Sequence, residues 1–146
     1  MELKSKCIVI LGGTNGMGAA SAIAFCAKGS RVTIVGPSAQ KGADVTADLS
    51  LMRTSQEVAG RVVRLLDGTA IDVLLNCVGI LIDRAEHTEE GIEKDFPVSY
   101  LSRFVFTERL AEIKGLGPSS VMTNVSAADP NKYAKYLTEF DDLEKV

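Results

Sequence analysis

Four glycines near the start of the chain have the spacing of a phosphate-binding turn. They lie in the run LGGTNGMG at residues 11–18, between an apolar strand pattern and an alanine-rich helix pattern. Glycine permits positive φ angles in such a turn and lets a pyrophosphate approach the N–H groups at the helix start. A glycine-rich turn that binds nothing is the alternative. The residues predicted to bind a dinucleotide here are Gly12, Thr14, Asn15, Gly16, Met17 and Gly18.

Four other side chains could exchange protons near the ends of the predicted strands. They are His87, Asp129, Tyr133 and Tyr136. In a reaction without redox chemistry, these residues are the candidate acids and bases. Each has a simpler interpretation, because a histidine on a loop is usually only solvated and Asp129-Pro130 is typical of a turn.

No metal site is expected from the sequence. The three cysteines, Cys7, Cys26 and Cys77, lie far apart in apolar segments, and His87 is the only histidine. We expect three buried thiols in a reducing compartment rather than a disulfide or a zinc site.

Strand and helix patterns alternate along the chain and can position these residues. The apolar runs KCIVIL (6–11) and RVTIVG (31–36) are typical of strands buried on both faces. Further strands are predicted at 46–49, 72–75 and 121–125, the last after a turn at 115–120. Helices are predicted at 16–29, with apolar spacing at Ala20, Ile23, Ala24 and Ala27, and at 51–66 and 89–114. The alternation predicts a parallel, doubly wound α/β sheet.

The connection between the second and third predicted strands is unusually short. Residues 36–47 leave room for about one helical turn, whereas a parallel crossover usually needs a dozen or more residues. We therefore expect one flank of the sheet to be thinly covered.

Length and composition are those of one globular domain. The chain has 146 residues, 46% hydrophobic and 24% charged, with a formal net charge of -3. We divide it into a Rossmann-like part at 1–128 and a polar, partly helical tail of the same domain at 129–146. The absence of a basic stripe excludes an electrostatic case for nucleic acid. No apolar run is long enough for a signal peptide or membrane span, so a cytoplasmic location is expected.

Several motifs in order resemble those of the short-chain dehydrogenase/reductase family. Gly12, Gly16 and Gly18 match the glycines of its T-G-x-x-x-G-x-G turn, with Leu11 in place of threonine. Asp48-Leu49 resembles the pair that contacts adenine, and NCVG (76–79) resembles N-N-A-G. Residues 87–110 are similar to the loop and long helix of the retinol-dehydrogenase-like branch, and NVSA (124–127) to N-V-S-S. The resemblance covers roughly residues 5–127.

The resemblance implies a Rossmann-like sheet and a nicotinamide cofactor. The family's strand order is 3-2-1-4-5-6-7, so this chain would form about five strands in the order 3-2-1-4-5, without the last strands and the catalytic helix. NAD(P) is the implied cofactor, although binding none is the alternative. The resemblance adds to the predicted cofactor-binding residues Asp48, Leu49, Asn76, Val78 and Gly79.

The sequence departs from the family pattern at its catalytic positions. The catalytic serine corresponds to Ala127, and the asparagine of the proton relay corresponds to Ser99. Neither Tyr133 nor Tyr136 has the lysine four residues later that a Tyr-x-x-x-Lys pair requires. Conventional carbonyl reduction is therefore not expected.

The residues that select between NAD and NADP are also missing from their usual places. Pro37 and Ser38 follow the second predicted strand, where the family has an acidic or an arginine selector. Lys41 could reach a 2′-phosphate, but a solvated surface lysine is the simpler interpretation.

Three functions remain open. The first and slightly favoured one is a non-redox isomerase, cyclase or dehydratase acting on a small apolar molecule. The second is a non-catalytic regulator that binds NAD(P) or a partner protein. The third is a residual reductase completed by another chain. A homo-oligomer is expected, formed through the long helix at 98–114 or through strand 121–125, which would be an open sheet edge.

Overall fold

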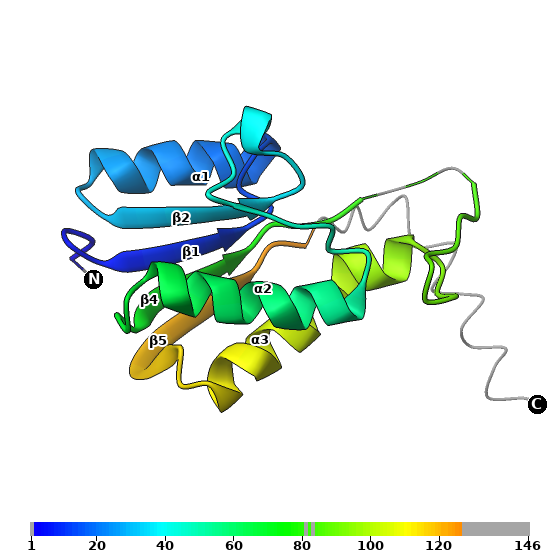
Figure 1. The fold of residues 1–146 in the computed structure, drawn as a ribbon. Coiled ribbons are helices and arrows are strands. Elements are labelled where there is room, and N and C mark those ends of the chain that lie inside the picture. The colour runs from blue at the N-terminus through cyan, green and yellow to red at the C-terminus, as the bar shows by residue number, and fades with distance from the viewer. Residues whose placement is uncertain (1, 81, 83, 127–146) are drawn as a thin grey trace, which may run out of the picture.

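The computed structural model describes residues 2–80, 82 and 84–126, and these form a five-stranded sheet with helices on both faces (Figure 1). All strand pairs are parallel, in the order β3-β2-β1-β4-β5. The predicted fold class and strand order are confirmed. The elements are β1 (Cys7–Leu11), α1 (Gly16–Ala27), β2 (Arg31–Gly36), the 3-10 turn η1 (Ala39–Lys41), β3 (Val45–Thr46), α2 (Met52–Leu65), β4 (Ile71–Asn76), the π-helical turn η2 (Pro97–Leu101), α3 (Ser102–Glu112) and β5 (Leu116–Asn124).

Strand β1 is the centre of the sheet. All five of its residues are buried, as expected for a continuous apolar run with neighbours on both sides. Leu11 is paired with Val35 of β2 on one side and with Asn76 of β4 on the other. The three strands therefore end together, at the carboxyl end of the sheet.

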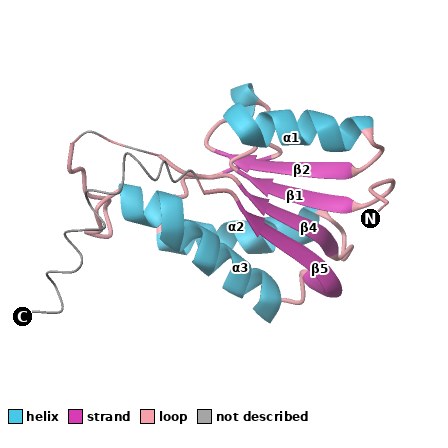
Figure 2. Ribbon diagram, turned by 180° about the vertical axis from the view of Figure 1, so that it is seen from behind, coloured by secondary structure: helices cyan, strands magenta, loops and turns pink. Residues whose placement is uncertain are grey.

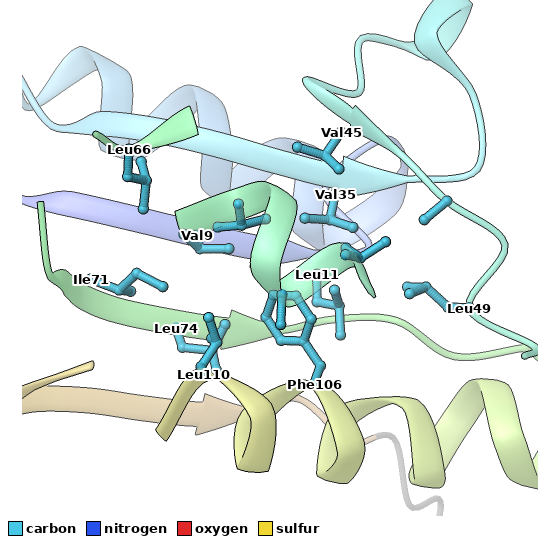
Figure 3. Packing of buried hydrophobic residues seen from close by; sticks show 14 of the residues in the cluster. Val9, Leu11, Val35, Val45, Leu49, Leu66, Ile71, Leu74, Phe106 and Leu110 are labelled. Atoms are coloured by element: carbon cyan, nitrogen blue, oxygen red, sulfur yellow. The ribbon is translucent and has the colours of Figure 1, made fainter. Parts of the chain in front are cut away.

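The two faces of the sheet carry different layers. Helix α1 covers one face, and α2 and α3 cover the other (Figure 2). Because side chains alternate along a strand, Ile8 and Ile10 pack with Ala22 of α1, while Val9 and Leu11 pack in the larger cluster with Phe106 of α3 (Figure 3). The larger core thus lies between the sheet and the α2–α3 layer.

Helix α1 does not bury the apolar spacing that its sequence suggested. Ala20, Ile23, Ala24 and Ala27 are exposed, and the buried residues are Gly18 and Ala22. A Cβ on Gly18 would lie 2.3 Å from the carbonyl oxygen of Gly12, so the helix start is pressed against the glycine turn. This contact sets the rotation of the helix and places Ala22, one turn later, against the sheet.

The prediction of three buried thiols is wrong for one of them. Cys7 is buried and Cys77 is half-buried, but Cys26 is exposed on α1 because of the same helix rotation.

The predicted helix 89–114 begins later than expected. Residues 86–94 form a short antiparallel hairpin, in which Lys94 N donates to Glu86 O (2.8 Å) and Thr88 N donates to Ile92 O (2.8 Å). Its tip carries Glu90, whose carboxylate accepts from Met52 N of α2 at 2.8 Å. An acidic residue expected to begin one helix therefore caps another, which has no side-chain cap of its own. Helical residues begin at Asp95, and Pro97 lies in the first turn, where its missing N–H leaves no helical hydrogen bond unmade.

Most of the predicted turn at 115–120 lies within β5, as a bulge at residues 117–120. Leu116 pairs with Ile71, but the next pair is Val121 with Val73, so residues 117–120 loop out of the ladder. Ser120 Oγ closes the loop by accepting from Gly117 N (2.7 Å) and donating to Ile71 O. Pro118 is tolerated because β5 is the last strand of the described sheet and Pro118 lies in its bulge.

Three other sequence predictions concern the β2–β3 connection, the C-terminal tail and membrane spans. The short connection between β2 and β3 contains one 3-10 turn, as expected. The tail at 129–146 lies outside the described residues, so the division of the chain at 128 stays a prediction. Within the described residues, no helix has both the length and the apolar character needed to cross a membrane.

Phe106 should be the side chain of α3 on which stability depends most. It is fully buried against the sheet, whereas Phe104 on the same helix is 58% exposed. Phe106→Ala should lower the free energy of unfolding by about 3–5 kcal/mol, because it leaves a cavity. Phe104→Ala, the matched control, should change it by less than about 0.5 kcal/mol. Urea denaturation measures both, and equal losses would contradict the layer assignment.

The ion pair between Lys6 and Asp72, at the amino end of the sheet, should make a contribution to folding stability that is lost at acid pH. Asp72 accepts from Lys6 Nζ (2.8 Å) and from Cys7 N (2.8 Å), and the lysine hydrogen bond, then the backbone one, lowers the pKa of Asp72. A lowered folded-state pKa stabilises above the unfolded pKa near 4 and is lost as the pH falls through the folded value.

Asp72→Asn should therefore cost about 0.5–1 kcal/mol at pH 7, a value typical of a solvent-screened pair. The cost should shrink towards zero as the pH falls through the lowered folded-state pKa of Asp72. Urea titrations from pH 7 to pH 2 measure this difference, with Glu108→Gln on the exposed side of α3 as control. A cost that does not change with pH would show that the ion pair is not its source.

Candidate functional site

A cavity of about 780 Å³ opens at the carboxyl ends of the central strands. The chain leaves β1 towards α1 on one face and leaves β4 towards α3 on the other, so the two connections separate above the sheet. In open parallel sheets, ligands bind in the crevice formed at such a switch point. The lining residues are Gly12, 14–18, Pro37, Lys41, 46–50, 77–80, Lys94 and Val98.

The cavity brings together all but one of the residues predicted to bind a cofactor. Asn76 is the exception, because it is fully buried at the end of β4. Its Nδ2 donates to Asn124 Oδ1 (2.9 Å), and its own Oδ1 has no partner among the described residues. The predicted residues that line the cavity are Gly12, Thr14, Asn15, Gly16, Met17, Gly18, Asp48, Leu49, Val78 and Gly79.

The glycine turn is closed towards the protein and open towards the cavity. Gly12 has φ +85°, and a Cβ there would lie 2.6 Å from Val78 N. Gly16 has φ +51° and nothing within 4 Å of its Cβ position. Of these two glycines, only Gly16 therefore leaves room for a ligand to approach.

The start of α1 offers hydrogen-bond donors at this opening. Asn15 Oδ1 accepts from Gly16 N (2.8 Å) and so caps the helix. The N–H groups of Met17 and Gly18 belong to the first turn, where no acceptor exists within the helix. Together with the helix dipole, they form an arrangement that suits an anion.

The segment 46–50 forms a second wall. Ala47 N donates to Gly36 O (2.9 Å), which holds the segment beside β2, and Arg61 of α2 donates to Thr46 O (2.9 Å). Asp48 Oδ1 accepts from Ser50 N (2.9 Å), so the turn is fixed by its own side chain. This segment and the glycine turn therefore form two walls of one cavity.

Arg103 of α3 fixes the opposite wall. Its guanidinium donates to Val78 O through Nε and Nη2, and to Val125 O through Nη1 at 2.9 Å. Burial lowers the pKa of Arg103 and raises that of the neighbouring Cys77 thiol. Ser99 adds two hydrogen bonds of 3.1 Å to Ile80. Arg103 is not among the residues predicted from the sequence, although it is the single cation within the largely apolar stretch 101–106.

Of the four predicted acids and bases, His87 is the one that the described residues include. His87 is exposed on the hairpin, opposite Glu93, and does not line the cavity. Asp129, Tyr133, Tyr136 and the Ala127 position lie outside the described residues. Among the residues that are described, no three His, Cys, Asp or Glu side chains are close enough together to hold a metal ion.

No protein-family profile matches the chain, but individual proteins do. The chain is 30% identical to oxidoreductase calI of Penicillium decumbens, over 88% of the chain and 45% of that protein. It is 27% identical to human retinol dehydrogenase 11, over 87% of the chain and 44% of that protein. The chain thus spans less than half the length of these relatives.

Solved structures share the fold. The 3-alpha-hydroxysteroid dehydrogenase from Pseudomonas sp., complexed with NADH, superimposes with a TM-score of 0.73 and 23% identity, covering 94% of this chain and 51% of that one. A short chain dehydrogenase from Burkholderia cenocepacia, in complex with NADP, has a TM-score of 0.66 and 23% identity, covering 92% and 64%.

Fold, motifs and relatives agree on one class of Rossmann-like protein. The chain belongs to the short-chain dehydrogenase/reductase family. The retinol dehydrogenase among its relatives agrees with the branch that the sequence suggested.

Gly18 should not tolerate a side chain, whereas Gly60, a glycine within α2, should tolerate one. Gly18→Ala would place a Cβ 2.3 Å from a carbonyl oxygen and should cost about 1–3 kcal/mol of unfolding free energy. The control is Gly60→Ala in α2, where the nearest atom is the flexible end of Arg64 at 3.5 Å. It should stabilise by about 0.5–1 kcal/mol. Urea denaturation compares the two, and changes of the same sign would contradict the packing of the turn.

Proposed function

We propose that this domain binds a nicotinamide dinucleotide and is the cofactor-binding part of an oxidoreductase. The observation that carries the proposal is the glycine turn, which lines the 780 Å³ cavity, is closed against Val78 at Gly12 and has open space at the Cβ position of Gly16. A cradle of this kind fits a pyrophosphate at the start of α1.

The walls of the cavity indicate how the rest of the cofactor would be held. The 46–50 segment, with Asp48 and Leu49, would bind the adenosine end, and the 77–80 loop would bind the opposite end. When bound, the nicotinamide supplies a site that accepts or donates a hydride. Arg103 and Ser99 act here as positioning residues, because they hold the 77–80 loop without lining the cavity.

The slightly favoured expectation of a non-redox enzyme gains no support. The relatives are named as oxidoreductases and dehydrogenases. The ionisable residues that line the cavity are Lys41, Asp48, Cys77 and Lys94. Of these, Asp48 is bound to a backbone N–H, and burial raises the pKa of Cys77. Among the described residues, nothing at the cavity therefore favours acid–base chemistry on a small apolar molecule.

Self-association stays a prediction. Phe104 of α3 and Val121 and Met122 of β5 are exposed apolar residues at the two surfaces expected to pair, 98–114 and 121–125. A regulator that binds a partner protein and a reductase completed by another chain depend on such surfaces. A cytoplasmic location likewise remains an expectation.

Dinucleotide binding should raise the thermal stability of the protein. NADPH, NADH and ADP should each shift the unfolding midpoint upward, since ADP contains the groups that the turn and the 46–50 segment would bind. A ligand at 100 times its Kd stabilises by about 2.7 kcal/mol. No shift with any of the three would overturn the proposal.

A matched pair of variants separates binding from folding. Gly16→Asn fills the opening of the turn, and asparagine tolerates a positive φ. It should weaken ADP binding by about tenfold or more, which corresponds to 1.4 kcal/mol. Gly68→Asn is the control, because Gly68 has φ +73°, equally open space and a place beyond the C-terminal end of α2, away from the cavity. Equal effects of the two on calorimetric affinity would contradict the assigned phosphate site.

A further inference from the structure

Two walls of the cavity come from segments that lie far apart in the chain. The 46–50 segment leads directly into α2, and the opposite wall consists of the 77–80 loop with Lys94 and Val98 further along the chain. The pairing of β2 with β3 ends at Thr46, and the pairing of β1 with β4 ends at Asn76. Most of both walls therefore lies beyond the paired strands, and their separation depends on contacts outside the sheet.

The hairpin at 86–94 connects one wall to the other. Its tip is a tight turn in which Gly91 N donates to Thr88 O (2.9 Å), and Gly91 has φ +77°. Glu90 lies in this turn, and its carboxylate accepts from Met52 N at 2.8 Å and from Arg53 N at 3.4 Å. The tip therefore contacts the start of α2, directly after the 46–50 segment, while the far end of the hairpin leads into the opposite wall.

The contact of Glu90 with α2 has a clear physical basis. The N-cap residue of α2 is Leu51, which has no side-chain cap hydrogen bond to offer. A carboxylate at a helix start accepts from N–H groups that lack helical partners and is favoured by the helix dipole. Among the described residues, the other hydrogen bond between 46–66 and 77–98 is the exposed Arg53–Glu89 pair at 3.5 Å. Glu90 therefore makes the shortest polar link between the two walls.

The base of the hairpin transmits its position to the cavity. Lys94 N donates to Glu86 O (2.8 Å), and Lys94 Nζ is paired with the Glu86 carboxylate at 3.2 Å. Val98 N in turn donates to Lys94 O at 3.3 Å. Lys94 and Val98 both line the cavity. A hairpin that left the start of α2 would therefore carry two lining residues with it.

We propose that Glu90 is a positioning residue that holds these two walls at the separation a ligand needs. Glu90 does not line the cavity itself, so it acts through the hairpin and the start of α2. Walls that are already in place lose less conformational freedom when a ligand binds, and this raises the affinity. The inference rests on the proposed dinucleotide binding, in which the adenosine end would lie against the 46–50 segment.

Removal of the Glu90 carboxylate should weaken a ligand that Glu90 does not touch. In isothermal titration calorimetry on the full chain, Glu90→Ala should bind ADP about fivefold more weakly, the change expected for one lost cap. Glu57→Ala is the matched control, because Glu57 is an exposed residue of α2, carries the same charge and does not line the cavity. It should leave the affinity unchanged. Equal ADP affinities of Glu90→Ala and the unaltered chain would overturn the inference while leaving the proposed function intact.

A second substitution separates positioning from simple helix capping. Leu51→Ser supplies α2 with a neutral cap of its own, since serine is a favoured N-cap residue. Added to Glu90→Ala, it should raise the thermal unfolding midpoint again, because the helix start regains an acceptor. The ADP affinity should stay about fivefold weaker, because the hairpin is still not tied to α2. Recovery of both the midpoint and the affinity would show that Glu90 only caps the helix.

Hydrogen exchange at the hairpin tip gives a measurement that does not depend on this rescue. Saturating ADP should slow the exchange of the Thr88 and Gly91 amide hydrogens by about twofold or more, since ligand binding and hairpin docking favour each other reciprocally. In Glu90→Ala saturated with ADP, this slowing should be lost. Exchange at the tip of the unaltered chain that does not respond to bound ADP would contradict the inference. Failure of ADP to bind the unaltered chain at all would instead reject the proposed function.

Discussion

The whole site depends on the close approach of two backbones, at Gly12 and Val78. A single Cβ on Gly12 would lie 2.6 Å from Val78 N, so only glycine lets the turn after β1 pass beneath the loop after β4. Gly12 N donates to Val35 O and Cys77 N donates to Leu11 O, both at 2.8 Å, which carries the ladder of the sheet up to this crossing. Beyond this crossing the two segments run to opposite faces of the sheet, and the cavity lies between them.

This crossing also decides how the helices lie. Gly18 packs on Gly12, and this contact sets the rotation of α1. The apolar side chains of the helix therefore do not determine which of its faces lies against the sheet. The exposure of Ile23 on α1 follows from that constraint, because burying Ile23 would rotate Gly18 away from Gly12. On the other face, Arg103 and Ser99 hold the 78–80 loop in the position that the crossing requires.

The structural features that could be predicted from the sequence are those that a local residue pattern determines. The buried runs, the strand order and the glycine turn follow from composition over a few residues and from the resemblance to one family. The failures involve contacts between distant segments. Glu90 caps α2 across 38 residues, so the acidic start of the predicted helix belonged to a hairpin instead. Arg103 bonds Val78 O across 25 residues, and no spacing rule shows that partnership.

The two ends of the sheet differ in a way that favours function at the carboxyl end. At the opposite end, Lys6 and Asp72 form a partly exposed ion pair whose oxygens are both bonded. At the carboxyl end, Asn76 is fully buried with a carbonyl oxygen that has no partner among the described residues, and the partly buried Arg103 forms no ion pair with a described carboxylate. Folding stability alone gives no reason to keep the Asn76 oxygen unpaired, since a buried unpaired polar atom costs free energy. A polar group of this kind beside the cavity is what is expected where the sheet was shaped to hold a ligand.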